Sequence, residues 1–164
     1  MIDYIAIPEE RMKILKKNEK WIKKLEELTN AKIKMNEEIK IEGNDFLQIM
    51  RIKEVLKAFG RGFGFNIALN LLDEEYYLEV INLKEYTKSR NRMVVLKGRV
   101  IGTKGKMKKI IERETNTKIA IYGKTISIIG KFENLRIAEK VIRMILEGKK
   151  HGTVLRFLEE KRVK

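Results

Sequence analysis

Two glycines three residues apart, Gly102 and Gly105, lie in a strongly basic part of the sequence. They mark its clearest candidate for a ligand-binding site. Six of the 13 residues at 97–109 are Lys or Arg, and none is acidic. Apolar residues then recur at helical spacing, at Met107, Ile110 and Ile111. Glycine lets a backbone approach a ligand closely, and a helix N-terminus offers free N–H groups and positive potential. The pattern therefore predicts a loop that opens a helix and binds phosphate groups.

This loop carries no catalytic group and fits neither of two common nucleotide-binding loops. A Walker loop has four residues between its glycines and a following Lys-Ser or Lys-Thr pair, whereas two residues separate Gly102 from Gly105. A dinucleotide-binding loop needs Gly-x-Gly-x-x-Gly directly after a strand. The chain has no cysteine and one histidine, His151, for which we expect a solvated loop position. Thiolate metal sites and catalytic triads that need histidine are therefore excluded, and we expect no metal and no cofactor.

The positive charge of the chain is concentrated in its second half. The 164 residues have a net charge of +14 and are 43% hydrophobic, which is enough for a core. Residues 1–82 hold 14 basic and 15 acidic side chains, whereas residues 83–164 hold 23 and 8. Such a field suits a polyanion. Because no apolar run approaches about 18 residues and no signal-peptide pattern opens the chain, we expect a cytoplasmic protein without membrane contact.

Hydrophobic periodicity predicts the same order of elements twice: strand, helix, helix, strand, strand, helix. In the first half we expect strands at 2–7, 32–35 and 39–41, and helices around 12–15, 17–28 and 46–59. In the second half we expect strands at 92–96, 118–122 and 125–129, a helix from the glycine loop to residue 114 and another from 132 to 145. Residues 76–83 read as a strand or an extended linker. A final amphipathic helix, with Thr153 as its N-cap, covers 153–161.

The two halves match residue by residue at an offset of 86. Residues 29–33, Thr-Asn-Ala-Lys-Ile, correspond to residues 115–119, Thr-Asn-Thr-Lys-Ile, and Ile14-Leu15 correspond to Val100-Ile101. An internal repeat of this kind indicates two similar modules, which we place at 1–82 and 83–164.

The first copy departs from the second at the loop. Lys16 and Glu19 stand where the second copy has Gly102 and Gly105. Side chains at both positions hinder close approach of a backbone, and Glu19 repels phosphate. The phosphate-binding role is therefore not expected for residues 16–19. The lysines nearby could still contact the backbone of a polyanion.

Residues 61–65, Arg-Gly-Phe-Gly-Phe, match the first five positions of the main RNA-binding signature of RRM domains. The next three residues miss that signature, and the continuation through Ile67, Ala68, Leu71 and Leu72 has helical spacing. The signature needs a central strand. We therefore expect a helix break at Gly60 followed by a short helix between the modules.

The sequence Val100-Ile101-Gly102-x-x-Gly105, followed by a helix and by Thr117 to Ile121, resembles a KH domain. The resemblance implies two tandem type I KH domains, each βααββα, of which the second has an intact Gly-x-x-Gly loop. In KH modules this loop clamps about four nucleotides of single-stranded nucleic acid.

Over residues 2–162 the chain is similar to the ribosome-biogenesis KH proteins of archaea and eukaryotes called partner of Nob one. The matching stretches include 59–63, 97–106, 122–125, 129–133 and 151–154. The resemblance implies a monomer that binds single-stranded 16S-type rRNA, or its precursor, near the 3′ end and assists its maturation. It also implies two protein partners, the Nob endonuclease and the alpha subunit of translation initiation factor two.

The expected binding residues fall into three groups. The loop residues bind phosphate, basic side chains supply countercharge, and apolar residues with the following strand receive bases and read their edges. The loop residues are Gly102, Thr103, Lys104 and Gly105. The countercharges are Lys97, Arg99, Lys106 and Lys109. The apolar and strand residues are Val100, Ile101, Ile119 and Ile121.

Two other functions compete with this interpretation. A small nuclease needs clustered carboxylates for Mg²⁺, but Glu112 and Glu114 in the basic half lie two residues apart on a helix and face apart, so we expect no enzyme. A protein adaptor that docks translation initiation or rRNA-processing factors, with RNA contact secondary, remains the alternative.

Overall fold

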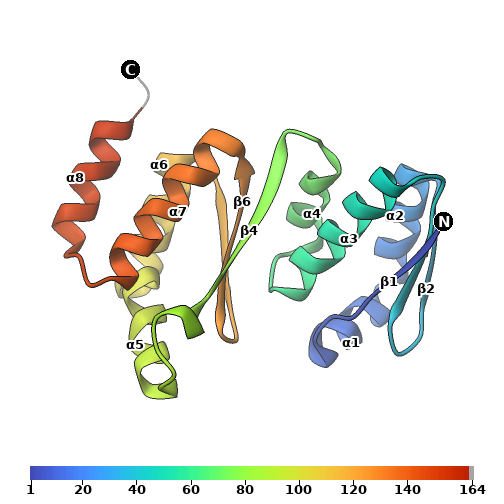
Figure 1. Ribbon diagram of the computed structural model, residues 1–164, viewed down its shortest axis with the longest axis horizontal. Helices are drawn as coiled ribbons and strands as arrows, with labels where there is room; N and C mark the ends of the chain where they lie inside the picture. The colour runs from blue at the N-terminus through green and yellow to red at the C-terminus, as the bar shows by residue number, and fades with distance from the viewer. Residues whose placement is uncertain (163–164) are drawn as a thin grey trace. The chain divides into compact units, whose positions relative to one another are not determined.

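The computed structural model describes residues 1–162 and divides the chain into two compact units, Met1–Glu74 and Glu75–Lys164 (Figure 1). Each unit combines a three-stranded antiparallel sheet with helices packed against it. The predicted α+β class is thereby confirmed. Within the described residues, no helix is both long and apolar enough to cross a bilayer.

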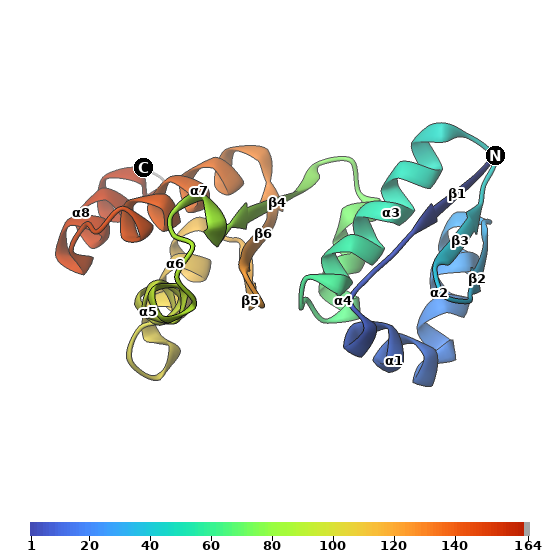
Figure 2. The ribbon, with the colours of Figure 1, turned by 60° about the horizontal axis from the view of Figure 1, so that its bottom comes forward.

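The first unit has the strand order β1-β3-β2. Its elements are β1 (Ile2–Ile5), α1 (Glu9–Lys17), α2 (Glu19–Thr29), β2 (Lys32–Met35), β3 (Ile39–Glu42), α3 (Phe46–Gly60), α4 (Phe65–Ala68) and the 3-10 turn η1 (Leu69–Leu72). Alternate strand residues face opposite sides, so Ile33 and Ile41 are buried while Lys32 and Lys34 are exposed. Helices α2 and α3 pack against these strands (Figure 2).

The second unit has the corresponding order β4-β6-β5. Its elements are β4 (Tyr76–Asn82), the 3-10 turn η2 (Leu83–Glu85), α5 (Arg90–Ile101), the 3-10 turn η3 (Thr103–Gly105), α6 (Lys106–Thr115), β5 (Lys118–Tyr122), β6 (Thr125–Lys131), α7 (Phe132–Leu146) and α8 (His151–Lys161). Its core gathers side chains from β4, β5 and β6 and from α5 to α8. The strands expected at 118–122 and 125–129 are β5 and β6, which pair as an antiparallel hairpin that turns at Gly123 and Lys124.

The predicted strand at 92–96 is wrong, because these residues lie within helix α5. Met93, Leu96 and Val100 are buried at helical spacing, whereas Val94 and Val95 are exposed. The hydroxyl oxygen of Ser89 accepts the N–H of Arg92 at 3.2 Å and caps the helix. The strand that opens the second unit is β4, which lies where the sequence is compatible with either a strand or an extended linker.

The predicted domain boundary at 82/83 is also displaced. Strand β4 pairs with β6 along its whole length, from Tyr76 opposite Lys131 to Asn82 opposite Thr125. These hydrogen bonds place residues 76–82 in the second unit, and the two compact units separate between Glu74 and Glu75.

Residues 61–72 form no strand, so the RRM reading is rejected as expected. They form the single turn α4 and the 3-10 turn η1, which pack on α3 within the first unit. Phe65 stacks on Trp21 with ring centroids 5.4 Å apart, and both rings contact Phe59 edge to face. Phe65, which matches the RNA-binding signature in sequence, is therefore engaged in aromatic packing with the helices of the first unit.

Helix α8 begins at His151, two residues before the predicted cap Thr153. His151 is half-buried and places Nε2 2.9 Å from the carbonyl oxygen of Arg99, so it is not the solvated loop residue expected from the sequence. Val154 and Leu158 are buried in the core of the second unit. These contacts fasten α8 to its own unit.

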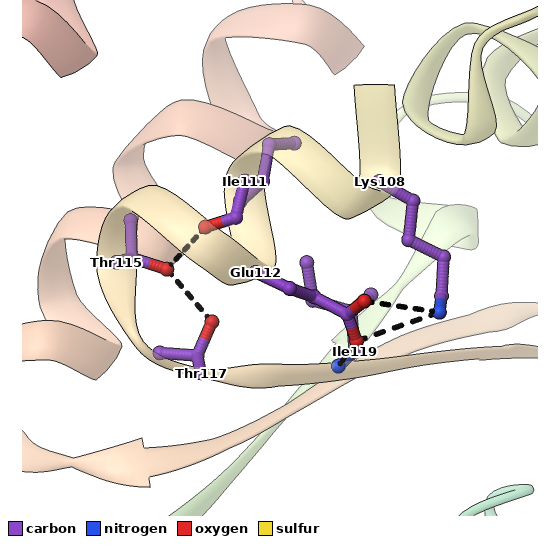
Figure 3. A network of polar contacts seen from close by, with 6 residues as sticks. All are labelled: Lys108, Ile111, Glu112, Thr115, Thr117 and Ile119. Carbon is purple, nitrogen blue, oxygen red and sulfur yellow. Dashed lines mark hydrogen bonds and ion pairs between the residues drawn. The ribbon is translucent and has the colours of Figure 1, made fainter. Parts of the chain in front are cut away.

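The internal repeat extends to individual hydrogen bonds. In the first unit the hydroxyl of Thr29 donates to the Leu25 carbonyl at 2.6 Å, and Glu26 accepts the N–H of Ile33 at 2.9 Å. In the second unit, 86 residues later, Thr115 donates to Ile111 at 2.6 Å and Glu112 accepts from Ile119 at 2.8 Å (Figure 3). Asn30 and Asn116 end the two helices with φ of 57° and 52°. The two units thus share their helix-to-strand connection in detail.

Candidate nucleic-acid interface

The loop at 102–105 joins α5 to α6 through three left-handed residues. Gly102, Lys104 and Gly105 have φ of 76°, 56° and 76°. The N–H of Gly105 donates to the carbonyl of Gly102 at 3.1 Å, and that of Gly102 to Gly98 at 2.8 Å. In Figure 2, which looks nearly along α5, the yellow loop after this helix projects from the unit. The backbone therefore turns outward where α6 begins.

The two glycines are needed for different reasons. A Cβ on Gly102 would lie 2.6 Å from the Cβ and 2.8 Å from the backbone nitrogen of Met107, so a side chain there would push α5 and α6 apart. A Cβ on Gly105 would meet nothing within 4 Å. Gly105 serves the backbone conformation and leaves its surroundings open to a ligand.

The side chains around the loop are mostly solvent-facing. Thr103, Lys104, Lys106 and Lys109 are all exposed. Helix α6 opens directly after the loop, with no acidic residue in its first turn. Free N–H groups and lysine charges therefore lie together at one helix end, which favours an anionic ligand.

The other two predicted cations point elsewhere. Lys97 donates to the carbonyl of Gly123 at 3.1 Å and so links α5 to the β5–β6 hairpin. Arg99 donates to the carbonyls of Ile145 and Lys149 at 2.5 and 2.6 Å, where α7 ends. The guanidinium of Arg99 thus caps α7 rather than reaching toward the loop.

The predicted apolar residues divide into core and surface. Val100 is fully buried and Ile119 is 4% exposed, so both belong to the core of the second unit. Ile101 and Ile121 are half-buried and present part of their surface to solvent.

Strand β5 is an edge of its sheet, and its outer edge is partly open. Hydrogen-bonding groups of successive residues in a strand alternate in direction. Because the N–H of Ile119 donates to Glu112 and not to β6, the N–H and C=O of Ile121 point to the same outer edge. Ile121 therefore presents one donor and one acceptor at the outer edge of the sheet.

Sequence reasoning missed the exposed face of α5. Val94 is 65% exposed, and a Cβ on Gly98 would meet nothing within 4 Å. With Ile101 these residues follow a helical spacing that leads to the loop. Assigning 92–96 to a strand concealed this face, which correct helical periodicity would have revealed.

The charge division seen in the sequence holds for the structural units. Residues 1–74 carry 14 basic and 13 acidic side chains, and residues 75–164 carry 23 and 10. The loop therefore lies on the strongly basic unit.

Ion pairs away from the loop stabilise the second unit. Burial opposes the charge of Arg143, but hydrogen bonds to Tyr86, Glu139 and Glu85 outweigh burial and raise its pKa. Hydrogen bonds from Arg162, at 3.2 and 2.6 Å, lower the pKa of Glu114. Within residues 1–162, no group of three or more potential ligands is placed to hold a metal ion.

Comparison with known proteins shows the family to which this chain belongs. Residues 77–163 match the family model for the second KH domain of PNO1, described as a eukaryotic-type KH domain (KH-domain type I). A KH domain-containing protein of Methanocaldococcus jannaschii is 35% identical over 170 residues, which cover 99% of this chain and 75% of that protein. The chain belongs to the PNO1/Dim2 family of KH-domain ribosome-biogenesis proteins.

Other PNO1/Dim2 proteins are similar over most of this chain. The pre-rRNA-processing protein PNO1 of Chaetomium thermophilum is 30% identical over 92% of this chain, which spans 62% of the fungal protein. The Pyrococcus horikoshii complex of a/eIF2alpha, aDim2p and rRNA contains a chain with 33% identity and a TM-score of 0.88, covering 99% of this chain and 94% of that one.

Proposed function

We propose that this chain is an rRNA-binding ribosome-assembly factor whose second unit holds single-stranded RNA at the 102–105 loop and the β5 edge. The observation that carries the proposal is the loop itself, which opens toward solvent at Gly105 among exposed lysines. A similar chain occurs in the Pyrococcus complex with rRNA, which supports this ligand.

The proposed mechanism is positioning without catalysis. Backbone N–H groups at the loop and at the start of α6 bind phosphates, and Lys104, Lys106 and Lys109 supply countercharge. Bases then lie over the exposed face of α5, where Gly98 leaves room. The backbone of Ile121 hydrogen-bonds a base edge. No metal or cofactor takes part.

The proposed architecture is two tandem type I KH modules. Both units have the same sheet order and the same capping hydrogen bonds at an offset of 86. The second module clamps RNA, and the first serves mainly as a platform for packing and docking.

The finer assignment follows the family resemblance. We propose that the RNA is the 3′ region of 16S-type rRNA or its precursor, and that the protein is a cytoplasmic monomer. The proposed protein partners are the Nob endonuclease and the alpha subunit of translation initiation factor two; the Pyrococcus complex, which contains a/eIF2alpha, supports the second.

An adaptor function is the second candidate, because the first unit exposes large apolar side chains. Leu28, Phe46 and Leu47 are 57, 63 and 60% exposed around the end of α2 and the start of α3. Leu28 and Leu47 also line a shallow pocket. In this reading protein docking comes first and RNA contact is secondary.

RNA titration at several salt concentrations separates the two candidates. The RNA clamp predicts tighter binding to a single strand than to its duplex, with a log–log salt slope of roughly −2 to −4 if about three to six phosphates are neutralised. Equal affinity for both, or affinity independent of salt, refutes the clamp and favours the adaptor.

A further inference from the structure

A carboxylate lies at the outer edge of β5, two residues before the outward-facing backbone groups of Ile121. Oε2 of Glu112 accepts the N–H of Ile119 at 2.8 Å (Figure 3). Residues 108 and 112 share one face of α6, and Gly105, the N-cap of this helix, precedes Lys108 on the same side, so this face leads from the loop to the strand edge. Nζ of Lys108 lies 3.4 Å from each carboxylate oxygen and holds the group in place (Figure 3).

The Glu112 carboxylate keeps acceptor capacity for a ligand. An ionised carboxylate is acceptor-only and has about four lone-pair sites. One is used by Ile119, and the two contacts with Lys108 are long for hydrogen bonds. The Glu112 side chain is 19% exposed, so solvent and ligands reach it.

The chemistry of this edge distinguishes nucleobases. Ile121 lies two residues beyond Ile119, about 7 Å along the strand, so one base can meet both the Ile121 backbone and the carboxylate. An acceptor-only group binds an amino group and repels a keto oxygen. Cytosine presents an amino group at C4, which Glu commonly accepts from, whereas uracil has an oxygen there.

We propose that Glu112 is a specificity-determining residue that selects a base with an exocyclic amino group, cytosine over uracil, at the β5 edge. This inference rests on the proposed RNA-binding function and adds base selection to it. The negative charge of Glu112 lowers the affinity for RNA in general. What this carboxylate adds is discrimination between bases.

The first unit provides a matched control. Glu26 makes the same bond to its strand, at 2.9 Å to the N–H of Ile33, but the place of Lys108 is taken by the buried Ile22. The first unit also lacks the glycine loop. Glu26→Gln therefore tests the structural part of this contact without the proposed base selection.

The experiment compares ten-nucleotide oligocytidylate and oligouridylate on the full chain, with circular dichroism to verify folding. We expect the wild-type protein to prefer oligocytidylate about tenfold, because the amino group gains a hydrogen bond to a charged acceptor. Glu112→Gln should reduce the preference to below twofold, since the amide also donates to the uracil oxygen. Glu26→Gln should leave the tenfold preference intact.

A modified RNA tests the same contact without altering the protein. Oligomers of N4,N4-dimethylcytidine lack the amino N–H donors and should bind the wild-type protein as weakly as oligouridylate. Equal preference in the wild type and Glu112→Gln, or a wild-type preference below twofold, overturns the inference while RNA binding itself stands. Absence of binding to either RNA overturns the proposed function as well.

Discussion

In the first unit one residue, Asn18, separates α1 from α2, whereas in the second unit four residues, 102–105, separate α5 from α6. Asn18 has φ −121°, and its side-chain amide donates to the carbonyl of Ile14 at 2.8 Å. The second junction instead uses three left-handed residues and turns outward. One junction is closed by its own side chain, and the other leaves backbone groups for a ligand.

Burial shows that the junctions also differ in length. Leu15 is fully buried, as Val100 is, while Ile14 is 40% exposed. The gap-free match of Ile14 to Val100 is therefore wrong in burial. Leu15 takes the buried place of Val100, which gives an offset of 85 before the junction, one less than the offset of 86 after it. The two units therefore show that one scaffold, with the same sheet order and the same strand-capping glutamate, supports both a closed junction and an open loop, the one that we propose to bind phosphate.

The largest expected effect comes from reversing charge in the open loop. Thr103→Asp combined with Lys104→Asp should weaken RNA binding roughly 30-fold or more, since two groups beside phosphate then repel it. Both side chains are exposed, so the melting temperature should change little.

The matched control reverses two lysines at the closed junction. Lys16→Asp with Lys17→Asp should weaken binding less than threefold. Equal losses from the two double variants would mean that the basic field matters and the open loop does not.

Fragments that contain one unit each test the same difference in RNA binding, and we expect an effect of intermediate size. Fragment 75–164 should keep most of the RNA affinity, and fragment 1–74 should bind at least tenfold more weakly, about 1.4 kcal/mol. Circular dichroism should show both fragments folded, because the cut lies between the compact units.

A fragment that begins at residue 84 sharpens this test. It lacks β4 and so loses all the pairing of β4 with β6. We expect it to be poorly folded and to bind RNA weakly for that reason. Equal affinity of folded 1–74 and 75–164 would contradict the division of labour.

The smallest effect on RNA binding is expected from a substitution on the exposed face of α5. Gly98→Ala should stabilise the protein by roughly 0.5–1 kcal/mol, because Ala favours a helix and the added methyl meets nothing within 4 Å. The same methyl should stand where a base lies and weaken RNA binding several-fold. Thermal melting and RNA titration on one sample should therefore show a higher melting temperature together with a lower affinity for RNA.

Gly152→Ala in α8 is the control, since a Cβ there also meets nothing within 4 Å. It should leave RNA affinity unchanged. If Gly98→Ala does the same, bases do not approach this face.

The features that depend on neighbouring residues could be predicted from the amino-acid sequence alone. Glycine spacing and the apolar periodicity after it predicted the loop and α6, and hydrophobic periodicity at 118–122 and 125–129 predicted the two strands that pair as β5 and β6. The internal repeat was visible because the residues that cap each helix and start the next strand are close in the chain. The proposed RNA-binding loop therefore required no tertiary information.

The features that depend on residues far apart in the chain could not be predicted in this way, because they follow from long-range pairing and packing. Two adjacent valines, Val94 and Val95, favour a strand locally, but a strand exists only where a partner supplies hydrogen bonds. Residues 125–131 supply them to β4, about 50 positions earlier, and this leaves residues 90–101 to form a helix. The direction of Arg99 toward the end of α7 and the occupation of the Ile119 edge by Glu112 likewise follow from packing. Local patterns fix which residues form a loop, while long-range pairing fixes which backbone groups remain free to bind.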